Sequence, residues 1–142
     1  MSAPTPPSEP GPPRHPERVA GLFVAVVWAA CTFAVFGVLA VLLDRDPVEA
    51  PVGPYFGIVV ILLSLAAVYL GIVVTVPARR PWLGAVGTAA GVYLVPVVAA
   101  ALVDLDLMLE QAASPFVLAA ALLALAPPVA CWAWFARRPG PR

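Results

Sequence analysis

Four long runs of uncharged, mainly apolar residues occupy most of this chain, and short polar segments separate them. The runs cover residues 19–43, 54–76, 82–103 and 115–136. A helix of about 20 apolar residues is long enough to cross the hydrocarbon core of a bilayer, which is roughly 30 Å thick. The pattern therefore predicts an all-α integral membrane protein, a four-helix bundle built from two antiparallel helical hairpins.

The polar segment between the second and third runs fixes how the chain turns. Arg79 and Arg80 would each cost roughly 2.5 to 3.5 kcal/mol at the centre of a bilayer, so we expect them to lie in water. Pro77 and Pro81 flank the pair and oppose one continuous helix through it. We therefore expect a hairpin turn here.

The remaining polar segments form tails and loops. Residues 1–18 contain seven prolines and little to bury, which predicts a disordered tail, and residues 137–142 form a short basic tail. Residues 105–113 are expected to add a helical turn at the membrane surface. Ser114 is expected to cap the fourth helix, with Pro115 at its first position.

The arginines are unequally divided between the two sides that this topology creates. The side with both tails and the middle loop carries seven of the eight: Arg14, Arg18, Arg79, Arg80, Arg137, Arg138 and Arg142. Because short loops rich in arginine stay in the cytoplasm, both termini are expected there. We take the topology-determining residues to be Arg79, Arg80, Arg137 and Arg138. The opposite loops are acidic.

The composition agrees with a location in lipid. The chain is 62% hydrophobic and 11% charged, with a mean hydropathy of +0.96, whereas soluble domains are about 45 to 50% apolar and 25% charged. Every basic residue apart from the single histidine is arginine, which we interpret as the codon usage of a GC-rich bacterium. The expected location is the plasma membrane of a bacterium. We expect no nucleic-acid partner.

Small residues recur at spacings of three and four in two of the runs. They are Gly84, Gly87 and Gly91 in the third run, and Ser64, Ala67 and Gly71 in the second. Helices in lipid associate where small residues let their backbones approach closely, so these two stripes are predicted to pack against each other. The third-run stripe also suits the seam of a homodimer. The sequence leaves both alternatives open.

Prolines and a few polar residues interrupt the apolar runs. Pro96, Pro127 and Pro128 are expected to kink the third and fourth helices. Five hydroxyl-bearing residues are expected to form hydrogen bonds between helices: Thr32, Tyr69, Thr75, Thr88 and Tyr93.

The residues that usually carry chemistry are missing from the runs. None of the four runs contains Asp, Glu, His, Lys or Arg, the groups on which proton relays and ion-coupled carriers depend. No nucleophile stands beside a base, and no phosphate-binding glycine loop is present. We therefore expect no enzyme activity, no cofactor and no metal. Cys31 and Cys131 are expected at depths that differ by roughly 9 Å, too far for a disulfide.

Two features remain open. Ala78–Pro81 recurs as Ala136–Pro139 at an offset of 58, which indicates either an internal duplication of the hairpin or a chance echo of two arginine-rich ends. The acidic loops suit either a divalent cation or plain hydration.

The function expected from these features is non-enzymatic. A small accessory or scaffold subunit would act through helix contacts with another membrane protein or with itself. The alternative is a small oligomeric channel or uncoupled carrier built around the kinked third and fourth helices. The bilayer is the one partner that the composition itself implies.

Overall fold

The computed structural model describes residues 16–47, 52–53, 55–78 and 80–137, with side chains from Arg18 onward. Its helices are α1 (Pro16–Leu43), α2 (Phe56–Thr75), α3 (Pro81–Ala101), α4 (Leu105–Ala113), α5 (Pro115–Leu123) and α6 (Ala126–Ala136). The described part of the chain contains no strand. The predicted all-helical class is therefore confirmed.

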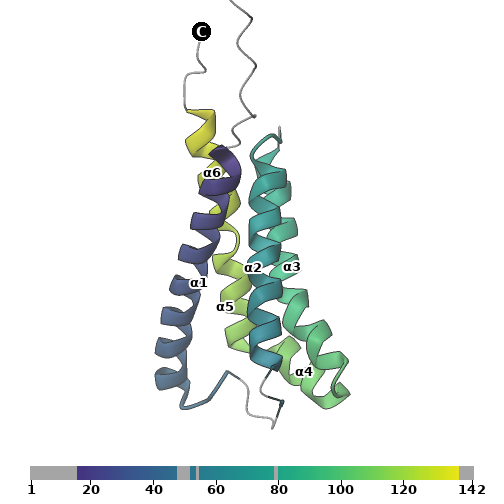
Figure 1. Ribbon diagram of the computed structural model, residues 1–142. Coiled ribbons are helices and arrows are strands. Elements are labelled where there is room, and N and C mark those ends of the chain that lie inside the picture. The colour runs from purple at the N-terminus through teal and green to yellow at the C-terminus, as the bar shows by residue number, and fades with distance from the viewer. Residues whose placement is uncertain (1–15, 48–51, 54, 79, 138–142) are drawn as a thin grey trace, which may run out of the picture.

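Four helical segments are long and apolar enough to cross a membrane. They are Arg18–Leu43, Phe56–Thr75, Pro81–Ala101 and Pro115–Ala136. The last combines α5 and α6, which continue one another with a short break between them (Figure 1). The beginning of α1, the end of α6 and the connection between α2 and α3 lie at one end of the molecule, and α4 lies at the other.

The helix boundaries differ from the expected ones by a few residues. α1 begins at Pro16, so residues 16–18 belong to the helix, where a proline suits the first turn. The expected disordered residues 1–15, Pro54 and the basic tail beyond Arg137 lie outside the described part. α3 ends at Ala101, and the Asp104 N–H donates back to the Ala100 carbonyl, 2.9 Å away.

The fourth apolar run forms two helices, not one. α5 ends at Leu123 and α6 begins at Ala126, with Pro127 and Pro128 in its first turn. A proline has no N–H to donate and its ring clashes with the carbonyl four residues earlier, so the preceding helix stops before the pair. The Leu125 N–H instead donates to the Leu122 carbonyl, 3.2 Å away, and closes a tighter turn.

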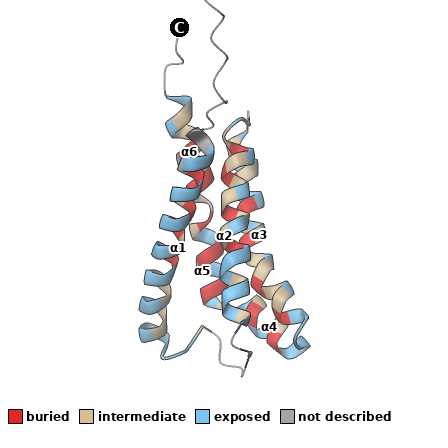
Figure 2. Ribbon diagram, viewed as in Figure 1, coloured by how far each residue is buried: buried red, intermediate tan, exposed pale blue. Residues whose placement is uncertain are grey.

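Buried side chains face the middle of the bundle, where α1, α2, α3, α5 and α6 meet (Figure 2). The cluster consists of Ala25, Trp28, Val68, Ile72, Val92, Ala120, Ala124 and Cys131. α1 joins this core mainly through its first half, where its last buried residue is Thr32, and then through Phe36, which is partly buried and packs against the core. Beyond Phe36 most of its large side chains are exposed, as at Val38 and Val41, so the last two turns of α1 lie apart from the core.

Candidate functional site

The most extensive helix contact joins α2 and α3, and it is a reciprocal fit of glycine and threonine. A Cβ added at Gly71 of α2 would overlap Thr88 Oγ1 of α3 and lie 2.9 Å from the Thr88 Cβ. A Cβ added at Gly84 of α3 would likewise overlap Thr75 Oγ1 of α2. Each glycine thus makes room for the other helix's threonine, and the two backbones approach closely.

The other small residues of the two stripes divide between this contact and the surface. Gly91 lies against Ala67, because a Cβ built on it would be 3.7 Å from the Ala67 Cβ, and Ser64 is buried. The structure corrects the predicted place of Gly87, which is exposed and whose added Cβ would meet nothing within 4 Å. At 100° per residue Gly87 lies about 60° round the helix from Gly84, away from α2.

The polar groups within the spans form fewer bonds between helices than expected. Tyr93 does so: its hydroxyl donates to the Ala112 carbonyl of α4 at 2.8 Å. For Thr88 the expectation is wrong, because its hydroxyl donates to the Gly84 carbonyl of its own helix at 2.8 Å. Thr32 Oγ1 and Thr75 Oγ1 are buried without any hydrogen-bond partner.

Two tryptophan side chains differ in their hydrogen bonding: Trp132 bonds to another span, and Trp28 has no partner. The Trp132 Nε1–H of α6 donates to the Ala78 carbonyl after α2, 3.2 Å away, and so holds the ends of two spans together. The Trp28 Nε1 of α1 is buried without a partner. Burying an unpaired donor costs stability, so Trp28 is a feature for which we have no structural account.

One face of α3 points away from the rest of the molecule. We call it the α3 outer face, and its exposed residues are Leu83, Val86, Gly87, Ala90 and Leu94. Beside it, a shallow apolar groove of about 410 Å³ runs between α3 and α5, with Val86, Ala90 and Leu94 along one wall. Gly87 and Ala90 leave the middle of this face without bulky side chains.

No family model, curated protein or solved structure matches this chain.

A second hollow opens between the second half of α1 and α2. This α1–α2 groove has a volume of about 430 Å³, and it is lined mainly by apolar side chains from α1, α2, α3 and α5. Phe36 of α1 and Phe116 of α5 meet in it edge to face, with ring centroids 5.4 Å apart. Gly37 and Gly57 lie on its walls, and a Cβ on either would meet nothing within 4 Å.

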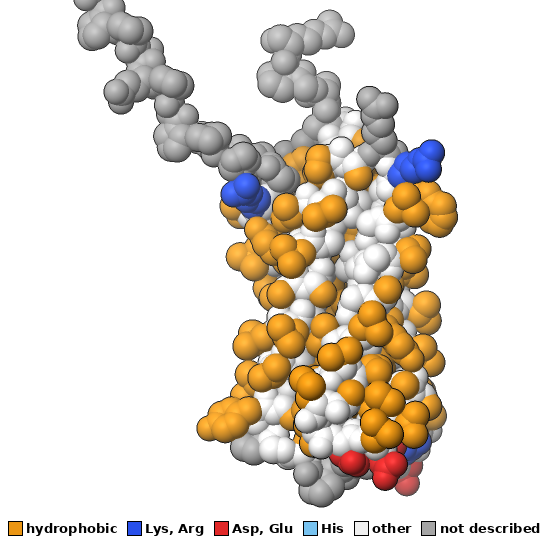
Figure 3. Space-filling view, turned by 90° about the vertical axis from the view of Figure 1, so that its right-hand side faces the viewer, with side chains coloured by type: hydrophobic (Ala, Val, Ile, Leu, Met, Phe, Trp, Pro, Cys, Tyr) orange, Lys and Arg blue, Asp and Glu red, His pale blue; other side chains and the backbone are white. Residues whose placement is uncertain are grey.

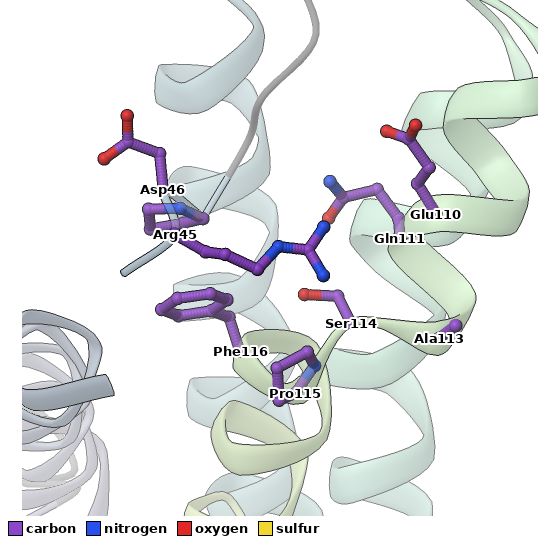
Figure 4. A pocket seen from close by; sticks show the side chains of 9 residues that line it. Arg45, Asp46, Glu110, Gln111, Ala113, Ser114, Pro115 and Phe116 are labelled. Atoms are coloured by element: carbon purple, nitrogen blue, oxygen red, sulfur yellow. The ribbon is translucent and has the colours of Figure 1, made fainter. Parts of the chain in front are cut away.

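A smaller polar cavity of about 250 Å³ adjoins this groove at the acidic end of the molecule. Asp44, after α1, has a positive φ of 50° and turns the chain so that Arg45 follows the helix end. Figure 4 shows the Arg45 side chain reaching toward Gln111 and Ser114. Ser114 is the N-cap of α5, as predicted, but its side chain makes no capping bond.

Charge is separated between the two ends of the described structure (Figure 3). Arg18, Arg80 and Arg137 are exposed at the end where α1 begins and α6 ends. Arg79 and Arg138, the other two predicted topology residues near the membrane, lie outside the described part. The acidic side chains and Arg45 gather at the opposite end, and a broad hydrophobic surface separates the two.

The described residues form neither a cluster of metal-ligating side chains nor a disulfide. Among the described residues, no three His, Cys, Asp or Glu side chains come together as metal ligands would. Cys31 is exposed and Cys131 is buried, and both are free thiols.

The predicted kink residues take two different places. Pro96 lies inside α3, which is assigned as one helix from Pro81 to Ala101, and it lines the α1–α2 groove. Pro127 and Pro128 are buried at the start of α6. A kink at Pro96 stays a prediction.

Sequence reasoning missed both the α1–α2 groove and the polar cavity. α1 is apolar round its whole circumference, so nothing in its pattern marks the point where it leaves the core. Gln111 was the available signal: it is the single amide side chain in the chain, and it is buried on α4, where a purely superficial helix would expose it.

Proposed function

We propose that this chain is a non-enzymatic accessory or scaffold subunit of a bacterial plasma membrane, acting through helix contacts. Its partner is another membrane protein or a second copy of itself. Both termini lie in the cytoplasm in this proposal.

The α3 outer face is the observation that carries the proposal. Large exposed apolar side chains are what lipid contact requires, but an exposed glycine gains nothing from lipid and leaves a gap in the surface. Small residues in membrane helices are typical of places where another helix packs closely. Gly87 and Ala90 are such residues, they do not serve the α2–α3 contact, and the groove toward α5 widens the surface available to a partner helix.

Two further observations favour this proposal. The four spans contain no acidic, basic or histidine side chain beyond Arg18 at the start of the first, so intramembrane proton or ion chemistry has no group to use. The separation of arginine from acidic side chains in Figure 3 favours the orientation with arginine in the cytoplasm.

Site-specific crosslinking in the native membrane tests the proposal. A photoreactive residue at Ala90 is expected to give one crosslinked product of fixed mass, whereas the same residue at Leu63, exposed on α2, gives none. Gly87→Leu fills the gap in the α3 outer face and should abolish the product. Gly57→Leu is the matched control, because that glycine is also open but lies on α2.

Two results would contradict the proposal. Equal crosslinking from Ala90 and Leu63 would show that the α3 outer face meets only random neighbours. Solute flux through liposomes that contain only this chain would instead favour the channel or uncoupled carrier.

A further inference from the structure

We propose that the polar cavity and the α1–α2 groove together bind one zwitterionic phospholipid whose headgroup carries a primary amine. The phosphate lies at Arg45, the amine faces the neighbouring carboxylates, and an acyl chain occupies the groove. This proposal uses a different surface from the α3 outer face, so it does not depend on the proposed function.

The two spaces are adjacent and differ in chemistry. They share three lining residues, Pro47, Gln111 and Phe116, so the polar cavity leads into the apolar groove. The cavity is lined by charged and polar side chains at the acidic end of the molecule, and the groove is lined mainly by apolar ones. A polar end joined to an apolar channel matches a ligand with a polar head and a hydrocarbon tail.

The cavity supplies hydrogen-bond donors for a phosphate. The Arg45 guanidinium, the Gln111 amide and the Ser114 hydroxyl lie near one another in Figure 4. α5 begins here with Pro115, and the N–H groups of its first turn have no acceptor within the helix. A helix N-terminus and a guanidinium both favour a phosphate. Arg45 is also the one arginine at this end of the described structure.

The carboxylates of the cavity select the rest of the headgroup. Asp46 and Glu110 line it together with Arg45, so two negative groups accompany one positive group. Figure 4 shows the Asp46 carboxylate turned away from the Arg45 side chain. A purely anionic headgroup would meet both carboxylates, whereas an ammonium group beside the phosphate would pair with them. Charge complementarity therefore points to a zwitterion, and a primary ammonium can in addition donate hydrogen bonds to the carboxylates, which choline cannot do.

The groove has the depth and the walls that an acyl chain needs. From Thr32 to Leu43, the 11 residue steps along α1 span about 17 Å, and one half of the hydrocarbon core is about 15 Å. Thr32 and Phe36 line the α1 wall, and Val60 lines the α2 wall. The open glycines Gly37 and Gly57 leave room on both sides. A partner helix about 10 to 12 Å wide would fill the groove less well and leave the polar cavity unused.

Lipid retention provides the test. The full chain is reconstituted in vesicles of dioleoyl phosphatidylethanolamine, phosphatidylglycerol and phosphatidylcholine in equal amounts, extracted in mild detergent and weighed by native mass spectrometry. We expect one phosphatidylethanolamine per chain, retained about tenfold over either of the other lipids, a ratio that corresponds to about 1.4 kcal/mol. The matched chains leave the headgroup as the one variable.

Four variants separate the parts of the site. Arg45→Gln should lower the retention of all three lipids. Glu110→Gln should remove the preference for phosphatidylethanolamine without lowering the retention of phosphatidylcholine. Gly37→Leu should block the acyl chain and lower the retention of all three lipids, whereas Ala66→Leu, at an exposed small residue of α2 outside the groove, should change nothing. Circular dichroism and melting temperature confirm that each variant folds.

Three outcomes would overturn the proposal. Equal retention of phosphatidylglycerol and phosphatidylethanolamine would show that the carboxylates do not select the headgroup. Equal effects of Gly37→Leu and Ala66→Leu on lipid retention would show that the acyl chain does not occupy the groove. A disulfide between two copies carrying Gly37→Cys, in a background without Cys31 and Cys131, would show that a second chain covers the groove.

Discussion

Replacing Gly71 by alanine introduces one methyl group at the tightest point of the α2–α3 contact. The new Cβ would overlap Thr88 Oγ1 and lie 2.9 Å from both the Cβ and the Cγ2 of Thr88. Thr88 has no free end to move aside, because its hydroxyl already bonds the Gly84 carbonyl. The helices must therefore separate, or Thr88 must change its rotamer and lose that bond.

The size of the effect follows from this geometry. Adding a methyl group to a well-packed core typically costs about 1 to 3 kcal/mol. Gly84→Ala should cost a similar amount against Thr75, whereas Gly91→Ala makes an ordinary contact of 3.7 Å and Gly87→Ala makes none. Any general gain from alanine in a helix is shared by all four variants, so it cancels in the comparison.

Reversible unfolding in mixed micelles, followed by circular dichroism as the fraction of denaturing detergent rises, measures these free energies. We expect the free energy of unfolding to be lower for Gly71→Ala and Gly84→Ala than for the parent chain. For Gly87→Ala and Gly91→Ala it should equal or exceed that of the parent chain. The double variant Gly71→Ala, Thr88→Gly should recover part of the stability lost in Gly71→Ala, with a coupling free energy of about 0.5 to 3 kcal/mol. Equal free energies of unfolding for the four alanine variants, or no coupling in the double variant, would refute the reciprocal fit of glycine and threonine.

Smaller tests follow from the hydrogen bonds. Trp132→Phe removes a bond between two span ends and should lower the free energy of unfolding by about 0.5 to 1.5 kcal/mol, while the exposed Trp82→Phe should not; equal values would contradict the tether. Tyr93→Phe should speed amide hydrogen exchange in α4 selectively, and unchanged exchange there would show that α4 does not need the bond. Thr75→Val removes a buried hydroxyl that has no partner and should be neutral or stabilising, whereas Thr88→Val loses a bond and should destabilise by about 0.5 to 1.5 kcal/mol; the reverse order in detergent unfolding would be evidence against this pairing.

The helices themselves could be predicted from the sequence because their cause is local. An uncharged run of about 20 residues bounded by charge and proline can satisfy its backbone in lipid only as a helix. The proline pair at 127 and 128 predicted a kink in a single fourth helix, whereas the structure has a break between two helices there. The helical class and the four spans thus needed no tertiary information.

The rotation of each helix about its axis could not be predicted in the same way. Gly84, Gly87 and Gly91 cover an arc of about 60°, and the spacing alone does not say which edge of that arc meets α2. Thr88 decides it, because its side chain enters the space above Gly71. To predict this contact, one must know how far α3 is shifted along its axis relative to α2, and neither helix sequence contains that information.

The α1–α2 groove depends on the same missing information. In water, an apolar helix surface must be covered, but in lipid an uncovered one costs little, so the sequence does not require α1 to follow the core along its whole length. The residues from Phe33 to Leu43 are as apolar as those before them. Only the folded arrangement shows that the last buried residue of α1 is Thr32 and that its core contact ends at Phe36.

The central claim is that four uncharged spans place the Arg80 turn in the cytoplasm and the Arg45 loop outside. Single cysteines at Pro77 and at Asp46, both outside the spans, test it directly in a chain with Cys31→Ala and Cys131→Ala. The account predicts that a membrane-impermeant maleimide labels Asp46→Cys in intact cells and labels Pro77→Cys only after the membrane is permeabilised. Labelling of both positions, or of Pro77→Cys alone, in intact cells would contradict it.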